Sequence, residues 1–361
     1  MSALAPRPGT LKIRAHMKGG VPAEVRPPAV LLHSNESAYG ASPHALEAMR
    51  AAVSDVHRYL EFPDRVLCPA IGEAENLDPA RIVIGHGTDD LLARAARAFL
   101  LPGDNLIRSE NGYLKVPNYA YANDADVISV PDIDFVPSVD AMLDAVTSRT
   151  RIVYLANPEN PAGTYLSGSE VRRLHASLPE NVLLILDCAY EEYVDAPDYE
   201  PGRALASEAD NVIVTHTFSK IYGLAGARVG WAYGPPDVMS ILHRLGVTFP
   251  LTTPSAAAAL AALEDRTHLK MVRDQNAEQR ALMTSALADM GLEVVPSQTN
   301  FILVHLPGQA AMLEDYLKNN GIMVRRFAAP AYADYIRITF GLPNENSQCL
   351  RAIRAFMDCR R

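Results

Sequence analysis

Lys220 lies in a run of residues whose types and spacing suit covalent binding of a phosphate-bearing aldehyde. The run covers residues 215–230, T-H-T-F-S-K-I-Y-G-L-A-G-A-R-V-G. Lys220 would form a Schiff base with the aldehyde, because neighbouring positive charge lowers its pKa and favours the neutral, nucleophilic amine. Thr217, Ser219 and Arg228 would bind the phosphate oxygens, Arg228 through its planar fork of donors. An isolated Ser-Lys pair is more often a surface turn, but the whole run favours a cofactor site.

Asp187 directly follows five aliphatic residues, 182–186. A carboxylate there needs a partner, and a protonated pyridine nitrogen would provide one and make the ring an electron sink. Tyr190 follows three residues later and could turn back to the phenolic oxygen of the same ring. Asp187 could instead cap the following segment, as aspartates after strands often do, and this cluster alone leaves both interpretations open.

A turn with two Asn-Pro steps, residues 157–164, follows another strand candidate. Asn160 could place its amide on the phenolic oxygen of the cofactor and on the substrate carboxylate. The prolines and the glycine would also form a rigid turn without any ligand, and this simpler interpretation explains the pattern fully.

Two glycines precede a helix in the segment G-H-G-T-D-D that begins at Gly85. The backbone N–H groups of Gly87, Thr88 and Asp89 would form a phosphate cradle at the helix N-terminus, although a lone Gly-x-Gly pattern is weak evidence. The carboxylates of Asp89 and Asp90 would repel a phosphate. We therefore expect both to point away from it, as first-turn acids that favour the helix dipole can.

Each of these four clusters follows a short apolar segment, and such segments alternate with helical patterns up to about residue 235. The strand candidates are residues 81–85, 105–107, 126–130, 151–155, 182–186, 211–214 and 227–231. Short, nearly continuous apolar strands separated by helices are typical of an α/β fold with a mainly parallel central sheet covered on both faces. Ligands of such sheets bind at the carboxyl ends of the strands, so we expect the four clusters to meet there.

The pattern changes after about residue 250. One long helical stretch, residues 255–290, precedes four strand candidates and a closing helix, which indicates a smaller α+β domain. Because 361 residues are long for one compact core, we expect more than one domain. We predict an N-terminal arm at residues 1–40 that joins the small domain, a large cofactor-binding domain at 41–248 and a small domain at 249–361.

The composition argues against several other classes of protein. A net charge of −9 lacks the basic footprint of a nucleic-acid-binding protein. The longest aliphatic stretch is far too short to span a membrane. Four cysteines without C-x-x-C spacing do not form a disulfide framework and fit a reduced, cytoplasmic setting. His33, His86 and His216 lack metal-ligand spacing with acidic partners, so we expect no metal, and at His216 a packed or surface histidine.

Together the four clusters resemble fold-type I pyridoxal-phosphate aminotransferases, most closely the histidinol-phosphate aminotransferase family. The resemblance extends from residues 34–43, S-N-E-S-A-Y-G-A-S-P, to residues 336–341, I-R-I-T-F-G. It implies pyridoxal 5′-phosphate as the cofactor of a transferase that moves an amino group between an amino acid and a 2-oxo acid. Lys220 would move the proton as general base and acid, with Asp187 and Tyr190 as its catalytic partners.

The resemblance also implies roles outside the four clusters. Arg337 would hold the substrate α-carboxylate, and Tyr113 would cover the pyridine face. Tyr59 would reach the cofactor phosphate of the other subunit in a homodimer with shared active sites. Arg325, near the penultimate strand candidate, offers a second cationic contact for a phosphate or a second carboxylate.

Three places depart from the pattern of that family. Residues 35–38 are N-E-S-A in place of N-E-N-P, the proline-containing lead-in to Tyr113 is absent, and Met17 stands where a tyrosine contacts the substrate phosphate. These changes affect the substrate side-chain pocket more than the cofactor site. We therefore expect an amino acid:2-oxo acid aminotransferase acting on a small amino donor and a keto acceptor. The alternatives are a histidinol-phosphate aminotransferase proper, or a decarboxylase or oxidase on the same fold.

Overall fold

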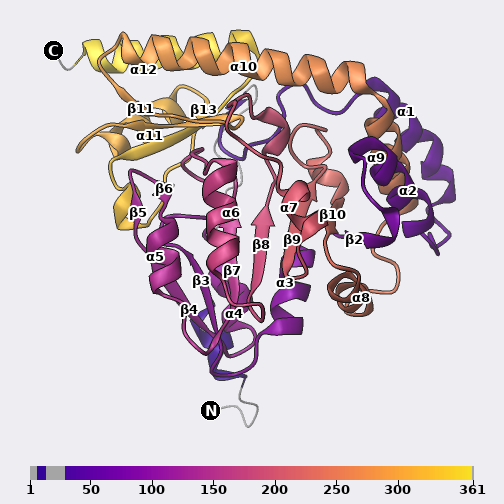
Figure 1. The fold of residues 1–361 in the computed structure, drawn as a ribbon. Helices are drawn as coiled ribbons and strands as arrows, with labels where there is room; N and C mark the ends of the chain where they lie inside the picture. Colours follow the sequence, from indigo (N-terminus) through magenta and orange to yellow (C-terminus); the bar gives the residue numbers. More distant parts are fainter. Residues whose placement is uncertain (1–5, 14–28, 360–361) are drawn as a thin grey trace.

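A seven-stranded sheet forms the centre of the computed structural model, which describes residues 6–13 and 29–359. The spatial order of the strands is β2-β10-β9-β8-β7-β3-β4 (Figure 1). They are β2 (Ile82–Gly85), β3 (Asn105–Ser109), β4 (Asp126–Val130), β7 (Thr150–Ala156), β8 (Leu183–Asp187), β9 (Val212–Thr217) and β10 (Gly230–Tyr233). Neighbouring strands are parallel except at β10, which is antiparallel to both β2 and β9. The predicted, mainly parallel sheet is confirmed.

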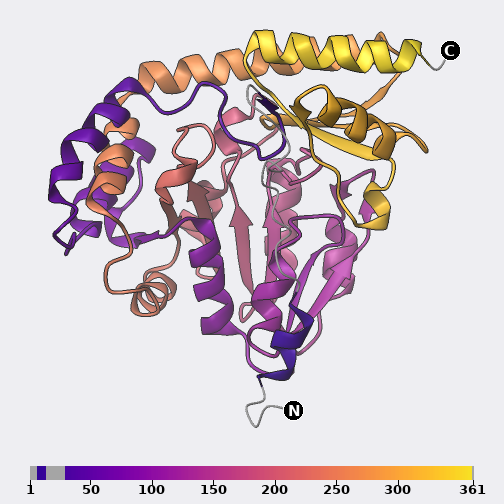
Figure 2. The same cartoon turned by 180° about the vertical axis from the view of Figure 1, so that it is seen from behind.

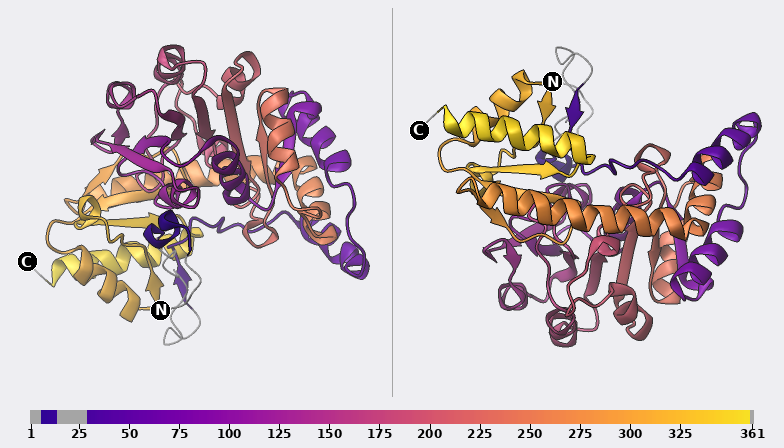
Figure 3. Two further views of the ribbon diagram at one scale, coloured as in Figure 1. Left: turned by 90° about the horizontal axis from the view of Figure 1, so that it is seen from below. Right: turned by 90° about the horizontal axis from the view of Figure 1, so that it is seen from above.

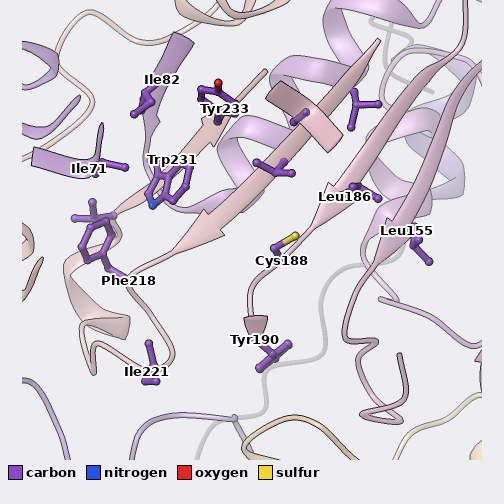
Figure 4. Close-up of a cluster of buried hydrophobic side chains, with 14 of the residues drawn as sticks. Ile71, Ile82, Leu155, Leu186, Cys188, Tyr190, Phe218, Ile221, Trp231 and Tyr233 are labelled. Carbon is purple, nitrogen blue, oxygen red and sulfur yellow. The ribbon is translucent and has the colours of Figure 1, made fainter. Parts of the chain in front are cut away.

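The central strands are apolar because both of their faces are buried. Every residue of β8 and β9 is buried. Leu184 and Leu186 pack into one hydrophobic cluster, whereas Leu183 and Ile185 pack into another on the opposite face. Figure 4 shows Leu186 in the first cluster, near Cys188. This double burial explains the continuous apolar runs in the sequence.

Helices cover both faces of the sheet (Figures 1 and 2). One face carries α5 (Val139–Asp144), α6 (Gly168–Ser177) and α7 (Gly202–Glu208), and the other carries α3 (Thr88–Phe99), α4 (Val116–Tyr121) and α8 (Pro236–Arg244). Helix α3 begins shortly after β2 ends at Gly85. Its N-terminus therefore lies at the carboxyl end of the edge strand β2, where the phosphate cradle is predicted.

Strand β10 begins three residues later than the predicted strand 227–231. The preceding residues form a short 3-10 helix, η5 (Ala225–Ala227), and Arg228 has a left-handed backbone with φ of +56°. A residue in that conformation cannot continue a strand. The apolar pattern of the sequence predicts a strand here and does not indicate the turn. The turn places the Arg228 side chain beside Gly87 at the predicted site.

The predicted helical stretch 255–290 is divided into α9 (Thr253–Glu264) and α10 (Arg266–Ala288). The break is at Asp265, whose side chain caps the second helix by accepting a hydrogen bond from the His268 N–H. Helix α9 packs against α1 (Pro43–Ala52) and α2 (Asp64–Glu75) in the first hydrophobic cluster. The packing therefore favours a boundary inside α10, later than residue 248, and the division into domains remains a prediction.

A smaller unit lies at the end of α10 (Figure 3). It has its own hydrophobic cluster. It contains an antiparallel sheet of β11 (Glu293–Val295), β12 (Phe301–His305) and β14 (Tyr335–Thr339), together with α11 (Ala310–Asn319) and α12 (Pro343–Asp358). Strand β1 (Val30–Leu31) pairs in parallel with β13 (Ile322–Met323) in the same unit. Residues 30 and 31 therefore lie in the smaller unit, while the bounds of the arm stay a prediction.

The remaining elements are short. They are the hairpin β5 (Asp132–Ile133) and β6 (Val136–Pro137), and the 3-10 segments η1 (Pro8–Lys12), η2 (Val53–Asp55), η3 (Pro79–Arg81), η4 (Glu191–Tyr193) and η6 (Pro330–Tyr332). Segment η1 packs beside α4, where the Gly9 N–H donates to Asp124 Oδ1. Within the described ranges, no helix combines the length and apolar character that a membrane span requires.

Candidate active site

A cavity of about 800 Å³ lies at the carboxyl ends of β7, β8 and β9 and is lined by both the sheet and the smaller unit. The predicted site residues that line it are Thr88, Asp89, Tyr113, Asn160, Asp187, Tyr190, Thr217, Ser219, Lys220, Arg228, Arg325 and Arg337. The four sequence clusters therefore meet in one place. Gly87 adjoins the cavity through Thr88, whereas Tyr59 does not line it.

The predicted phosphate cradle consists of backbone with no room for an added side chain. Gly87 precedes α3 with φ of +76°, and a Cβ atom there would come within 2.4 Å of Arg228 Nη2. A Cβ atom at Gly230 would lie 2.8 Å from the backbone nitrogen of Thr88. The first N–H groups of a helix have no partner within it and favour an anion. These features fit the phosphate of the expected cofactor.

Two hydroxyl groups and a guanidinium lie beside the predicted cradle. Arg228 Nη1 donates to Ser219 Oγ at 3.1 Å and to the Ala225 carbonyl at 3.0 Å. Thr217 Oγ1 accepts a hydrogen bond from the Ser219 N–H at 3.0 Å. These contacts hold Arg228, Ser219 and Thr217 together at the cavity wall.

The acidic residues of the first turn of α3 are held by partners of their own. Asp89 accepts hydrogen bonds from Lys115 Nζ at 2.6 Å, Tyr119 at 2.5 Å and Tyr113 at 3.2 Å. Burial disfavours its charge, but the hydrogen bonds from Lys115 and Tyr119 outweigh that effect and lower the pKa of Asp89. Asp90 pairs with Arg94 and accepts from the His86 N–H.

Lys220 presents its amine to the cavity near the arm. Nζ lies 3.5 Å from the Ser34 carbonyl oxygen and 5.6 Å from the centre of the Tyr190 ring. Burial, together with the positive charge of Arg337, lowers the pKa of Lys220 to about 8. The structure therefore favours the neutral amine more strongly than water does.

Asp187 ends β8 with its carboxylate buried. Oδ2 accepts a hydrogen bond from the Tyr154 hydroxyl at 2.7 Å, and Oδ1 accepts one from Thr215 Oγ1 at 3.1 Å. Burial raises the pKa of Asp187 despite these two hydrogen bonds. Because the carboxylate lines the cavity and caps no helix, the geometry favours the ring-nitrogen interpretation over the capping one.

Tyr190 and Asn160 are joined by hydrogen bonds. The Tyr190 hydroxyl accepts from Asn35 Nδ2 at 2.9 Å and from Asn160 Nδ2 at 3.3 Å. Burial raises the pKa of Tyr190 to about 12, although Arg337 opposes the shift. The hydroxyl therefore keeps its proton and can donate it in a hydrogen bond to a ligand.

Arg337 lies on β14 with its guanidinium buried beside Asn160. Nη1 donates to Asn160 Oδ1 at 2.6 Å and Nη2 donates to the His33 carbonyl at 2.9 Å. Nε makes no hydrogen bond with the described part of the chain. Arg325 forms an antiparallel backbone bridge with Arg337. Burial lowers the pKa of Arg337 to about 10, opposed by Tyr190 and reinforced by Arg325.

Two predicted residues have partners other than the expected ones, and a third cannot be placed. Tyr113 lines the cavity and donates to Asp89, while Tyr59 is exposed and stacks on Phe249 with ring centres 4.1 Å apart. Met17 lies outside the described residues. A role for Tyr59 at a neighbouring subunit's site stays a prediction.

Sequence reasoning missed three residues that orient the predicted ones. Tyr154 and Thr215 hold Asp187, and Asn35 holds Tyr190. Tyr154 is a tyrosine inside an aliphatic strand candidate, a pattern that could have drawn attention to it. Asn35 has φ of +56° and accepts a hydrogen bond from Thr339, far away in sequence, which no local pattern indicates.

Comparisons with known proteins agree with this geometry. The family model described as aminotransferase class I and II matches residues 27–354. A histidinol-phosphate aminotransferase of Granulibacter bethesdensis is 41% identical over 99% of this chain and 97% of its own length. One of Maricaulis maris is 42% identical over 98% of this chain and 99% of its own length.

Solved structures show the same fold. A histidinol-phosphate aminotransferase of Sinorhizobium meliloti, in complex with pyridoxal-5′-phosphate, superposes with a TM-score of 0.87 at 31% identity over 92% of each chain. A putative histidinol-phosphate aminotransferase of Erwinia carotovora gives a TM-score of 0.88 at 27% identity, over 92% of this chain and 97% of its own. The chain therefore belongs to the class I and II aminotransferase family, and its cofactor is pyridoxal 5′-phosphate.

Proposed function

We propose that this aminotransferase acts on histidinol phosphate and its keto counterpart, with an amino acid and a 2-oxo acid as the second pair. The observation that carries the proposal is the pair of arginines at the cavity. Arg325 lowers the pKa of Arg337, so their two charges repel each other where both line the cavity. A phosphate dianion would relieve that repulsion more fully than one carboxylate, and the curated relatives are named for this substrate.

The phosphate of the cofactor would be held by backbone N–H groups at the start of α3 and by Thr217, Ser219 and Arg228. Asp187 would contact the pyridine nitrogen and Tyr190 the phenolic oxygen. When bound, pyridoxal 5′-phosphate supplies an aldehyde for the amine and a ring that accepts electrons. The cradle at Gly87, which an added Cβ would fill, supports this placement.

Lys220 would carry the proton during the transfer. A pKa of about 8 leaves roughly a tenth of the amine neutral at pH 7, against ~0.03% for an unperturbed lysine. Once the amino donor displaces it, Lys220 Nζ would remove the proton from the substrate Cα and later return a proton as general acid. The Tyr190 ring, with its centre 5.6 Å from Nζ, and the Ser34 carbonyl, at 3.5 Å, lie beside the amine.

Arg337 would fix the anionic end of either substrate, with Asn160 holding the guanidinium in place. The expected preference for amino acids rested on three departures from the family pattern, and one of them, Met17, lies outside the described residues. The same two arginines would bind the α-carboxylate when an amino acid occupies the cavity. One site could therefore accept both members of the exchange.

We further infer a homodimer in which Tyr59 serves the neighbouring site. Exposed apolar side chains gather on two chain segments, at Val53, Val56, Tyr59, Phe62, Val66, Val247 and Phe249. Apolar patches of this kind commonly mark protein interfaces. A cytoplasmic location is inferred from the free cysteines, of which Cys68, Cys188 and Cys349 are buried.

Steady-state kinetics test the substrate assignment. We expect kcat/KM for histidinol phosphate to exceed that for aromatic, acidic and basic amino acids by more than tenfold. Arg325→Gln should reduce kcat/KM for histidinol phosphate about 10- to 100-fold, since a charge-assisted hydrogen bond contributes about 1.5–3 kcal/mol. Arg354→Gln, at an exposed position of α12, is the control. A tenfold preference for any amino acid would overturn the assignment.

The same protein separates transamination from decarboxylase or oxidase chemistry. A transaminase incubated with its amino donor alone should convert the bound cofactor stoichiometrically to pyridoxamine phosphate. Release of carbon dioxide, or consumption of oxygen, in equal amounts would favour the alternatives on the same fold.

A further inference from the structure

His216 lies on β9, directly before Thr217, but on the opposite face of the sheet from Asp187. Thr215 faces Asp187 and hydrogen-bonds to it, so the next residue along the strand points the other way. The His216 ring stacks on Trp231 of β10, with ring centres 4.3 Å apart and planes 9° apart. Figure 4 shows Trp231 within the hydrophobic cluster on that face, which also includes Cys188.

Two carboxylates flank the buried His216 ring. Nε2 lies 3.9 Å from Glu191 Oε1, and Nδ1 lies 3.7 Å from Glu192 Oε1. His216 is 2% exposed, and both nitrogens lack an ordinary hydrogen bond within the described chain. A neutral imidazole would turn a lone pair toward one carboxylate, whereas an imidazolium would turn an N–H group toward each.

The surrounding charges favour the imidazolium. Glu191 hydrogen-bonds to Arg203, which also lies 3.6 Å from Glu75. This one guanidinium belongs to a cluster that holds three carboxylates, those of Glu75, Glu191 and Glu192. Burial opposes a charge on His216, but Glu191, Glu192 and Glu75 outweigh it and raise the pKa of His216 above its usual value. Across the sheet, the same charge favours the ionised form of Asp187.

A metal ion is the main competing explanation for this cluster. Cys188, Glu191 and His216 each offer one atom, and the three atoms lie within 4.8 Å of one another. However, Glu191 Oε1 already accepts a hydrogen bond from Arg203, and a metal there would lie beside a guanidinium. Burial and the charge of Glu191 raise the pKa of the Cys188 thiol well above its usual value, which disfavours a thiolate ligand. A protonated His216 turns an N–H group toward each of the two flanking carboxylates. It requires neither a metal beside a guanidinium nor a thiolate at Cys188.

We propose that His216 is a positioning residue, held as an imidazolium that ties the segment following β8 to the end of β9. Glu191 and Glu192 belong to η4, which begins directly after Tyr190 and four residues after Asp187. His216 directly precedes the segment that carries Thr217 and Lys220. The ion pairs therefore join the two chain segments on which most of the predicted cofactor contacts stand.

The protonation of His216 is measured without reference to activity. Histidines labelled with 13C at Cε1 are followed by NMR in the cofactor-bound enzyme, and His216→Gln assigns the His216 resonance among the ten. We expect His216 to remain protonated at pH 7.5 and to titrate at higher pH than surface histidines. Glu192→Gln should lower its midpoint. A neutral His216 at pH 6.5, or a resonance that moves on addition of zinc or chelator, would overturn the proposal.

Kinetics test the positioning role, which rests on the proposed roles of Asp187 and Lys220. His216→Gln should lower kcat about 10- to 100-fold with little change in KM, since small displacements of catalytic groups have effects of this size. His216→Arg should restore part of kcat and remove the alkaline decline that deprotonation of His216 causes. His243→Gln is the matched control, because His243 pairs with Asp64 at 3.1 Å on the surface.

The outcomes separate this proposal from the proposed function. If His216→Gln and His243→Gln behave alike in kcat and pH profile, His216 is not a positioning residue, whatever the substrate. If histidinol phosphate fails as a substrate, the NMR result and the kcat comparison on the accepted amino acid still stand. A His216→Arg enzyme no more active than His216→Gln, though folded by circular dichroism, would also contradict the role of the positive charge.

Discussion

Gly87→Ala should weaken cofactor binding through a defined steric conflict. Gly87 has φ of +76° and ψ of 170°, a backbone region that is almost exclusive to glycine. A Cβ atom would lie 2.4 Å from Arg228 Nη2, far inside van der Waals contact. Either the backbone at the start of α3 must change, or Arg228 must leave the position from which it would bind the phosphate.

The size of the effect follows from the free energies of the backbone strain and of the lost contact between Arg228 and the phosphate. Backbone strain of this kind costs about 1–3 kcal/mol and should appear as lower stability of the cofactor-free enzyme. Loss of the hydrogen bond between Arg228 and the phosphate costs about 1.5–3 kcal/mol, which corresponds to a 10- to 100-fold increase in Kd for the cofactor. Stability and cofactor affinity should therefore fall together in Gly87→Ala.

Two other glycines serve as matched controls. Gly103 has φ of +91° with no atom within 4 Å of an added Cβ, so Gly103→Ala introduces strain without a clash. Gly226 lies beside the cradle, and an added Cβ meets nothing within 4 Å. Urea unfolding of the cofactor-free proteins measures stability, and fluorescence titration measures Kd. If Gly87→Ala binds the cofactor as tightly as Gly226→Ala, the cradle is not where we place it.

Further predictions concern the catalytic residues Lys220 and Asp187 and the proposed sharing of Tyr59 between two subunits. Borohydride reduction should fix the cofactor to Lys220 alone, and a label mapped to any other lysine would refute this. Asp187→Asn should retain the cofactor but react ~10²–10⁴-fold more slowly, and a near-normal rate would leave Asp187 without a catalytic role. The rate at which cofactor-free enzyme captures the cofactor should rise with pH up to about pH 8 and then level off, because the neutral amine of Lys220 reacts. A rate still rising at pH 10 would mean that the pKa is not lowered. Mixing Lys220→Ala with Tyr59→Phe chains should give partly active heterodimers, and a fully active Tyr59→Phe monomer would contradict sharing.

Much of the fold was predictable because the central strands are buried on both faces. A buried parallel strand leaves a continuous apolar run, and each run at β4, β7, β8 and β9 was located within a few residues. The start of β10 was not, because the left-handed Arg228 interrupts an otherwise strand-like pattern. The break at Asp265 was missed because alanine and leucine continue on both sides of it. The amino-acid composition of a segment does not indicate a single residue whose backbone conformation differs from that of the helix or strand around it.

The candidate site also contains residues that the local sequence indicates and residues that it does not. Asp187, Thr217 and Lys220 could be proposed because each stands at or shortly after the end of a strand, and the carboxyl ends of parallel strands meet. Arg228 could be proposed from its position eight residues after Lys220. His216 was expected to be simply packed or exposed, because its carboxylate partners are about 25 residues earlier in the sequence. The charges that surround it come from three other elements, η4, α2 and α7. Spacing within one segment cannot indicate such a cluster.

Arg337 shows why the substrate end of the cavity depends on the whole fold. Its guanidinium has five N–H donors. The structure directs two of them to Asn160 in the large unit and to the His33 carbonyl in the arm. The arm is held in turn by Asn35, which accepts from Thr339 and donates to Tyr190. Because both units and the arm fix one another here, the remaining donors of Arg337 are oriented before any substrate binds. A binding group fixed in advance loses less entropy on binding, so the affinity for an anionic substrate depends on contacts between residues about 300 positions apart.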